Sequence, residues 1–254
     1  MSNNSTGRHS STPKCMACRD GQRLDFDFTM AFQPILDLHT GRPYAYEALV
    51  RGLQGESAAT ILALVNDSNR YQFDQSCRVK AIELASSLRL QDLPDCKLSI
   101  NFLPNAVYQP AACIQATLKA ASQCDFPLDR LMFEVTEGEQ LDDPAHLVTI
   151  FEEYQRHGFT TAIDDFGAGY SGLNLLARFQ PHVLKLDMEL TREIDRSVVR
   201  QAIVAGIILM AKKLDILIIG EGIETQAECD VLSDLGVRYM QGYFFARPAI
   251  GKLV

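Results

Sequence analysis

The stretch from Thr160 to Leu173 reads TTAIDDFGAGYSGL. It begins with a short apolar run typical of a buried strand, sets Asp164 and Asp165 side by side, and then turns on glycines. Burying one carboxylate is costly, and a second like charge beside it adds to that cost. We therefore expect either solvent or a cation to reach the end of this strand.

The same alternation of strand and turn extends outward from this stretch along the chain. We expect strands at residues 28–35, 44–50, 97–102, 131–136, 160–164, 183–187, 216–222 and 239–245. Helical periodicity predicts helices at residues 58–69, 74–90, 111–124, 144–158, 173–179, 195–215 and 225–236. About eight strands that alternate with helices in one domain favour a TIM-type (β/α)8 barrel. The alternative, an open doubly wound sheet, usually carries a glycine fingerprint after its first strand, and this sequence has none.

The composition limits the class of protein. The chain has 254 residues, 47% of them hydrophobic, and a formal net charge of −8. This charge argues against charge-driven binding to nucleic acid or to an anionic membrane. The apolar runs are too short to span a bilayer and the N-terminus lacks a signal peptide, so we expect a cytoplasmic protein. Residues 1–24 are polar and predict a flexible tail, and residues 25–254 form the expected barrel.

Two further segments have a structural interpretation. Cys15 and Cys18 form a close pair, but zinc requires about four ligands, so we interpret them as stray thiols of the tail. The segment at residues 196–213, RSVVRQAIVAGIILMAKK, carries a wide apolar stripe. An outer helix of a barrel must turn such a stripe toward the sheet, and we expect this one to do so.

Polar residues follow the expected strands, where a barrel carries its chemistry. They are Glu47, Asn101, Glu134, Glu137, Asp164, Asp165, Lys185, Asp187, Glu221, Glu224 and Gln241. Carboxylates that converge on one mouth repel each other unless a cation neutralises them, and oxygen ligands with one amide suit Mg²⁺ or Mn²⁺. Two ions about 4 Å apart suit in-line displacement at phosphorus. Lys185 could then orient the water or stabilise charge on the phosphate, although a structural ion pair is the alternative.

The segment YEALVRG at residues 46–52 resembles the signature of the EAL family, the bacterial cyclic di-GMP phosphodiesterases. The resemblance extends from about Phe28 to Pro248 in the family's motif order. It includes FQPI, SINF, FEVTE, AIDDFGAGYSGL, LKLD, GEGIET and MQGYFFARP. One EAL triplet alone would mean little, whereas this ordered set is highly specific.

The resemblance implies roles for individual residues. The family's metal ligands fall on Glu47, Asn101, Glu134, Asp164, Asp165 and Glu221. Lys185 matches the catalytic lysine, Glu221 also matches a general base, and Glu137 matches the glutamate that holds the loop after the DDFG strand. The substrate-binding positions fall on Gln33, Leu49, Arg51, Asp187, Glu224 and Gln241.

The function implied by the resemblance is metal-dependent hydrolysis of cyclic di-GMP to linear pGpG. The implied cofactors are two Mg²⁺ or Mn²⁺ ions, and the implied partner is a second copy that docks through the loop at residues 166–173. The alternative is a catalytically silent receptor for cyclic di-GMP or a protein-interaction module. Degenerate members of the family typically lose part of the acidic set, which is present here.

Overall fold

The computed structural model describes residues 24–138, 144–169 and 172–254. Within these residues, eight strands close into a barrel and a ninth pairs with β1. The strands are β1 (Thr29–Asp37), β2 (Arg42–Arg51), β3 (Lys97–Asn101), β4 (Leu131–Thr136), β5 (Thr160–Phe166), β6 (Val183–Leu186), β7 (Leu217–Gly220), β8 (Tyr239–Met240) and β9 (Ala249–Ile250). The expected barrel is confirmed. The expected tail, with Cys15 and Cys18, lies outside the described residues apart from Leu24.

One strand runs against the direction of the others. β1 pairs antiparallel with both β2 and β8, whereas the steps from β2 to β8 are all parallel. Only residues 38–41 connect β1 to β2. A parallel pair needs a crossover of about a dozen residues or more, so this short turn can only make a hairpin.

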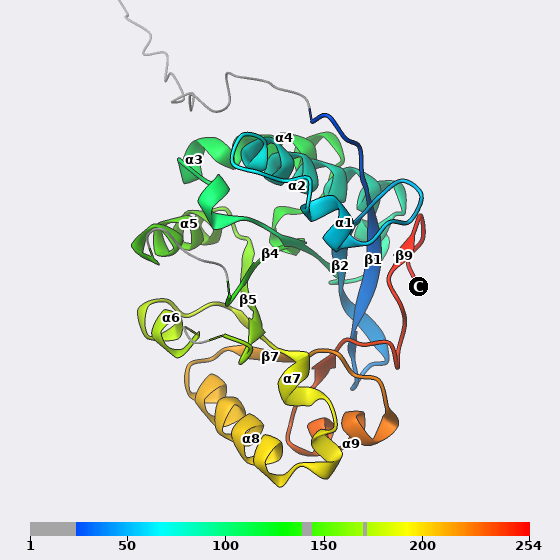
Figure 1. The fold of residues 1–254 in the computed structure, drawn as a ribbon, viewed down its shortest axis with the longest axis vertical. Coiled ribbons are helices and arrows are strands. Elements are labelled where there is room, and N and C mark those ends of the chain that lie inside the picture. The colour runs from blue at the N-terminus through cyan, green and yellow to red at the C-terminus, as the bar shows by residue number, and fades with distance from the viewer. Residues whose placement is uncertain (1–23, 139–143, 170–171) are drawn as a thin grey trace, which may run out of the picture.

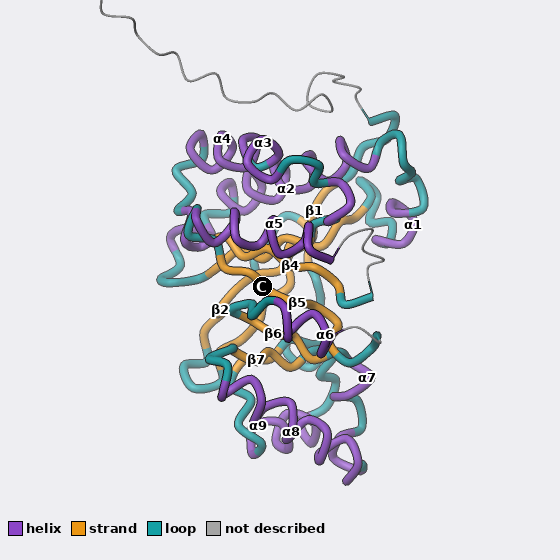
Figure 2. The backbone as a smooth tube through the Cα atoms, turned by 90° about the vertical axis from the view of Figure 1, so that its left-hand side faces the viewer, coloured by secondary structure: helices purple, strands orange, loops and turns teal. Residues whose placement is uncertain are grey.

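Helices cover the barrel on several sides. They are α1 (Ala58–Leu62), α2 (Arg70–Ser87), α3 (Pro110–Cys113), α4 (Gln115–Gln123), α5 (Pro144–Arg156), α6 (Gly172–Arg178), α7 (Met188–Thr191), α8 (Val198–Lys213) and α9 (Gln226–Asp234). Figure 1 shows α2, α3 and α4 at one end of the molecule and α7, α8 and α9 at the other. Figure 2 shows the strands between these two groups. No helix in the described ranges is both long and apolar enough to cross a membrane.

One side of α8 packs on the barrel as expected, with Ile207, Ile208 and Met210 against the core, but apolar residues on its other sides are exposed. Val198, Val199 and Leu209 are 79%, 70% and 57% exposed, whereas Val204 and Ala211 are buried. The helix is apolar on more than one side, and a helix that lies on a barrel can bury only the side that faces the sheet. An apolar surface therefore remains in contact with solvent.

An apolar layer lies inside the barrel. Its buried members are Ile35, Ala45, Met132, Ala162, Val183 and Ile219. Each comes from a different strand, and together they close the barrel to water. The polar site lies directly above this layer.

Candidate active site

The polar site follows from strand alternation. Because residues i and i+2 share a face of a strand, the residue two positions beyond each member of the apolar layer also points inward. In chain direction these residues are Glu47, Glu134, Asp164, Lys185 and Glu221. β1 runs the other way, so its matching residue precedes Ile35 and is Gln33, which pairs with Glu47 in the register of the hairpin. The apolar layer and the polar layer are thus successive levels of one barrel.

Lys185 lies at the centre of the polar layer and is fully buried. In the described part of the chain, its ammonium contacts four carboxylates. Its Nζ lies 2.8 Å from Glu221 Oε1, 2.9 Å from Glu134 Oε2, 3.0 Å from Asp164 Oδ1 and 3.7 Å from Glu47 Oε2. One ammonium cannot neutralise this set, so the cluster has an excess of acidic groups.

The excess appears in the acid–base properties of the cluster. Burial raises the pKa of Glu134 to about 8 although Lys185 opposes the shift, and burial with the charge of Asp164 raises the pKa of Glu221 well above its usual value. Burial would also raise the pKa of Asp164, but Lys185 and hydrogen bonds bring it below its usual value. Burial would lower the pKa of Lys185, but the carboxylates raise it well above its usual value. At neutral pH the cluster must therefore hold protons or bind another cation.

Amides fix the remaining oxygens of the cluster. Asn101 Nδ2 donates to Glu47 Oε1 at 2.8 Å, and Gln241 Nε2 donates to Glu47 Oε2 at 2.8 Å. Gln241 Nε2 also lies 3.1 Å from Gln33 Oε1. The hydroxyl of Ser99 donates to Glu134. These contacts hold the carboxylates in place before any ligand arrives.

The two adjacent aspartates have different environments. Asp164 is buried against Lys185, whereas Asp165 is partly exposed on the cavity wall. Asp165 has a φ of +53°, a left-handed conformation that Asp tolerates better than most residues. Burial, together with the charges of Asp164 and Asp187, raises the pKa of Asp165 to about 7. Asp165 therefore adds to the acidic excess from its position on the cavity wall.

Glu137 holds the loop that follows β5. Its carboxylate accepts hydrogen bonds from the backbone N–H groups of Gly167 and Gly172, both at 2.7 Å, and from that of Gly169 at 3.4 Å. Its own N–H donates to the carbonyl of Asp164 at 2.9 Å. Glu137 thus connects the end of β4 to the segment that carries both aspartates.

An open cavity of about 500 Å³ lies above the cluster. Most of the predicted site residues line it: Gln33, Glu47, Leu49, Asn101, Asp164, Asp165, Asp187, Glu221, Glu224 and Gln241. Glu134 and Lys185 are fully buried below, and Glu137 contacts the loop. Arg51 is not brought into this wall, and its guanidinium donates to the carbonyl of Val50 at 2.7 Å. The structure therefore assembles the predicted set except for Arg51.

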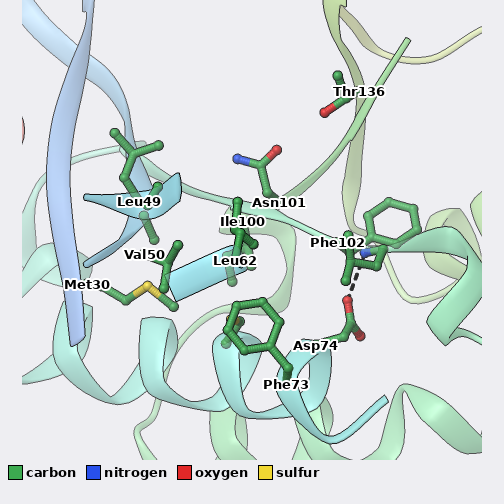
Figure 3. A pocket seen from close by; sticks show the side chains of 14 residues that line it. Met30, Leu49, Val50, Leu62, Phe73, Asp74, Ile100, Asn101, Phe102 and Thr136 are labelled. Atoms are coloured by element: carbon green, nitrogen blue, oxygen red, sulfur yellow. Dashed lines mark hydrogen bonds between the residues drawn. The ribbon is translucent and has the colours of Figure 1, made fainter. Parts of the chain in front are cut away.

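A second, apolar pocket of about 280 Å³ adjoins the charged cavity (Figure 3). The walls of both include Leu49, Asn101 and Thr136. Figure 3 shows Met30, Val50, Leu62, Phe73 and Ile100 around it. An acidic cavity beside an apolar pocket suits a ligand with both a charged and a flat, weakly hydrated part.

The donor set of the charged cavity fits divalent cations. Two groups of carboxylates have oxygens within 4.8 Å of one another: Glu47 with Glu134 and Asp164, and Asp164 with Asp165 and Glu221. Asp164 belongs to both groups. The buried Oε1 of Gln241 has no hydrogen-bond partner among the described residues. Carboxylate and amide oxygens are ligands that Mg²⁺ and Mn²⁺ prefer, so these groups could hold metal.

A model of the EAL domain family matches residues 19–248. The chain belongs to the EAL domain family. A standalone EAL protein from Vibrio cholerae, in its c-di-GMP bound form, is 52% identical with a TM-score of 0.87, and the match covers 91% of this chain and 96% of that one. The manganese and cyclic di-GMP complex of BlrP1 from Klebsiella pneumoniae is 35% identical with a TM-score of 0.82, and the match covers 88% of this chain and 56% of that one.

Curated relatives match this EAL domain over part of their length. The antirepressor BluF of Escherichia coli is 30% identical over 88% of this chain, which spans 55% of BluF. The cyclic di-GMP phosphodiesterase NbdA of Pseudomonas aeruginosa is 29% identical over 88% of this chain, which spans 29% of NbdA. Relatives of this EAL domain therefore include both a named enzyme and a named regulator.

Sequence reasoning missed several residues around the site. Thr136, Met188, Arg192 and Tyr243 line the charged cavity. Arg192 and Met188 follow Asp187 in the sequence, and their nearness to the LKLD motif was the available signal. Nothing in the spacing indicated which of the residues after a strand end would turn back toward the cavity.

Proposed function

We propose that this EAL domain hydrolyses cyclic di-GMP to the linear dinucleotide pGpG with Mg²⁺ or Mn²⁺ as cofactor. The main support is the excess of buried carboxylates around Lys185, beneath a cavity open to solvent. Such an excess suits two divalent cations, and a pair of cations suits displacement at phosphorus. The relatives support the substrate, because NbdA is named a cyclic di-GMP phosphodiesterase and the Vibrio structure is a c-di-GMP bound form.

The cations would be held by Glu47, Asn101, Glu134, Asp164, Asp165 and Glu221. When bound, they would supply positive charge that activates water and stabilises the phosphate oxygens. Glu137 would act from behind this set, because it holds the loop that follows the two aspartates. Loss of such a supporting contact usually weakens metal binding or activity.

Lys185 and Glu221 would carry the charge and proton steps. The carboxylates keep Lys185 protonated, so its ammonium could hold charge beside the reacting phosphate. The raised pKa of Glu221 makes its carboxylate form a stronger base than an ordinary glutamate, and this form could accept the proton of the attacking water. The water oxygen forms a bond to phosphorus, the bond from phosphorus to one ribose oxygen breaks, and that oxygen takes up a proton.

The substrate would bind across both pockets. Gln33, Leu49, Asp187, Glu224 and Gln241 line the charged cavity that would take the sugar–phosphate ring. The apolar pocket that shares Leu49 would take a guanine base, whose flat face loses little hydration there. The predicted role of Arg51 requires its guanidinium to leave the carbonyl of Val50 and turn toward the substrate.

A homodimer through the loop after Asp165 is part of the proposal. Leu173, at the start of α6, is 65% exposed, and the exposed valines of α8 add apolar surface. Apolar surface of this kind often marks an interface. Residues 170–171 of the loop lie outside the described residues. Sedimentation at increasing concentration should give the mass of a dimer, and a monomer throughout would contradict this part.

The test is an assay of the purified protein with cyclic di-GMP and Mn²⁺ or Mg²⁺, with EDTA as the metal-free control. We expect chromatography to show pGpG only with metal, and none from Glu47→Ala, which removes a carboxylate shared by two amides. A Glu47→Ala protein that hydrolyses at the parent rate would contradict the metal assignment. Tight binding without product would indicate the receptor instead, and neither product nor binding would contradict the proposal as a whole.

A further inference from the structure

An ion pair crosses the rim of the charged cavity. Arg192 follows α7, Glu224 precedes α9, and Arg192 Nη2 lies 2.7 Å from Glu224 Oε1. Both side chains line the cavity and are about half exposed, at 45% and 47%. Figure 1 shows α7 and α9 at the same end of the molecule. The pair thus faces both solvent and the space that a substrate would enter.

Arg192 has a distinctive charge among its neighbours. Of the described residues that line this cavity, it is the only basic one, whereas six are acidic. Lys185 is buried below and surrounded by carboxylates, and Arg51 lies outside the wall. An anion at the rim would therefore find its side-chain cation in Arg192. A guanidinium matches the geometry of a phosphate and binds it with two parallel hydrogen bonds.

The ion pair can exchange partners at little cost. Ion pairs that water reaches contribute about 0–1 kcal/mol, because the charges are screened and the side chains lose freedom. When a phosphate arrives, Arg192 can take it as its new partner, and the carboxylate of Glu224 is then free to contact water or another group of the substrate in the cavity. A more deeply buried pair could not separate so easily.

The backbone on both sides of the pair is fixed by one buried carboxylate. Glu228 Oε1 accepts a hydrogen bond from the N–H of Glu193 at 2.8 Å, and its Oε2 accepts from the N–H groups of Glu224 and Thr225 at 2.9 and 3.0 Å. Glu228 is 3% exposed and also forms a capping box with Thr225 at the start of α9. It therefore connects the loop after α7 to the loop before α9, so Arg192 reaches the rim from a rigid base.

We propose that Arg192 is a substrate-binding residue of this site and that Glu228 is its positioning residue. The inference rests on the proposed function, which supplies a cyclic dinucleotide with two phosphates. One phosphate would lie over the carboxylate cluster, and the guanidinium of Arg192 would exchange Glu224 for the other. Arg192 thereby adds affinity for a second phosphate and takes no part in bond cleavage.

The test compares Arg192→Met with Arg196→Met. Arg196 is 79% exposed, pairs with its neighbour Asp195 and does not line the cavity. Isothermal titration of cyclic di-GMP in Ca²⁺, with products checked by chromatography, should show about tenfold weaker binding for Arg192→Met. Arg192→Lys keeps the positive charge but loses the planar guanidinium that makes two parallel hydrogen bonds. Its affinity for cyclic di-GMP should lie between those of the parent and of Arg192→Met. Arg196→Met should bind within about twofold of the parent.

Kinetics with Mn²⁺ separate binding from chemistry. Arg192→Met should raise KM for cyclic di-GMP about tenfold and change kcat less than about threefold. Bis(p-nitrophenyl) phosphate has one phosphate, so Arg192→Met should lower kcat/KM for this substrate less than it lowers kcat/KM for cyclic di-GMP. Glu228→Gln should raise KM in the same direction, and this effect should disappear in the Arg192→Met background, as a double-mutant cycle would measure.

The outcomes distinguish this proposal from the proposed function. A parent that hydrolyses cyclic di-GMP, with Arg192→Met equal to it in binding and KM, would overturn the role of Arg192 alone. A parent that binds without forming pGpG would contradict hydrolysis, and weaker binding by Arg192→Met would still support the contact. A parent that neither binds nor hydrolyses would overturn both.

Discussion

Two buried clusters of charge differ in their balance. On the buried side of α2, Arg78 Nε lies 2.8 Å from Asp74 Oδ2, and both side chains are essentially inaccessible to solvent. Arg78 also donates to the hydroxyl of Tyr154, and Asp74 Oδ1 accepts from the N–H of Leu103 at 2.9 Å. Below the charged cavity, by contrast, Lys185 contacts four carboxylates, so negative charge is in excess.

The difference separates a structural cluster from a functional one. The Arg78–Asp74 pair is balanced in charge within the protein, so it needs no added ion. Nη2 of Arg78 has no hydrogen-bond partner among the described residues, and the guanidinium lies over the rings of Phe102 and Phe133. A cluster with surplus charge is complete only with protons or an added cation. Both clusters are buried, so burial of charge alone does not indicate function. The imbalance does, together with the cavity above it.

The largest effect should come from breaking the balanced cluster. Arg78→Met leaves Asp74 buried without its partner, which should lower the free energy of unfolding by about 3–5 kcal/mol. Urea unfolding measures this loss. The double variant Arg78→Met with Asp74→Asn removes both charges and should cost less than Arg78→Met alone. A loss below about 1 kcal/mol for the single variant would contradict the buried pair as described.

A change at the centre of the unbalanced cluster should affect chemistry more than folding. Lys185→Met should lower kcat about 10²- to 10³-fold, the scale for removing one preorganised group that stabilises charge. Binding of cyclic di-GMP should change far less. The control is Lys119→Met, on the exposed side of α4. If Lys185→Met kept the parent kcat, the ion pairs of Lys185 would be structural only.

A smaller effect should follow from the support behind the cluster. Glu137→Gln replaces an acceptor of three backbone N–H groups by an amide that accepts fewer, so the loop after β5 should loosen. Metal affinity should fall about 10- to 100-fold. Glu153→Gln on α5, whose carboxylate pairs with the exposed Arg156, is the matched control. Equal Mn²⁺ affinity in the two variants would contradict a role of Glu137 in supporting the metal site.

Sequence reasoning predicted the strands of the barrel because their apolar pattern and turns are local properties. It did not predict the direction of β1, because the alternation of inward and outward residues is the same whichever way a strand runs. The short turn at residues 38–41 sets the direction, since it can only join antiparallel strands. It also did not predict that α8 would expose apolar residues beside the side that packs on the barrel, because an apolar residue has the same sequence signal whether it faces a barrel or solvent.

The site was predictable where strand ends determine it. Glu47, Glu134, Asp164, Lys185 and Glu221 lie one pleat beyond the apolar layer, so topology alone brings them together. Arg192 and Glu228 could not be found in this way. Their positions depend on how two loops pack against each other across the rim, and no local pattern records this contact.

The most direct test of the central claim is isothermal titration of Mn²⁺ into EDTA-treated protein at pH 6 and pH 8. The pKa values of Asp165 and Glu134 are raised to about 7 and about 8, so both carboxyls hold protons at pH 6 and Mn²⁺ must displace them. We predict binding at pH 8, proton release near pH 7, and affinity at least about tenfold weaker at pH 6. No binding at pH 8, or an affinity that does not change with pH, would contradict the claim that the surplus charge at the mouth is a metal site.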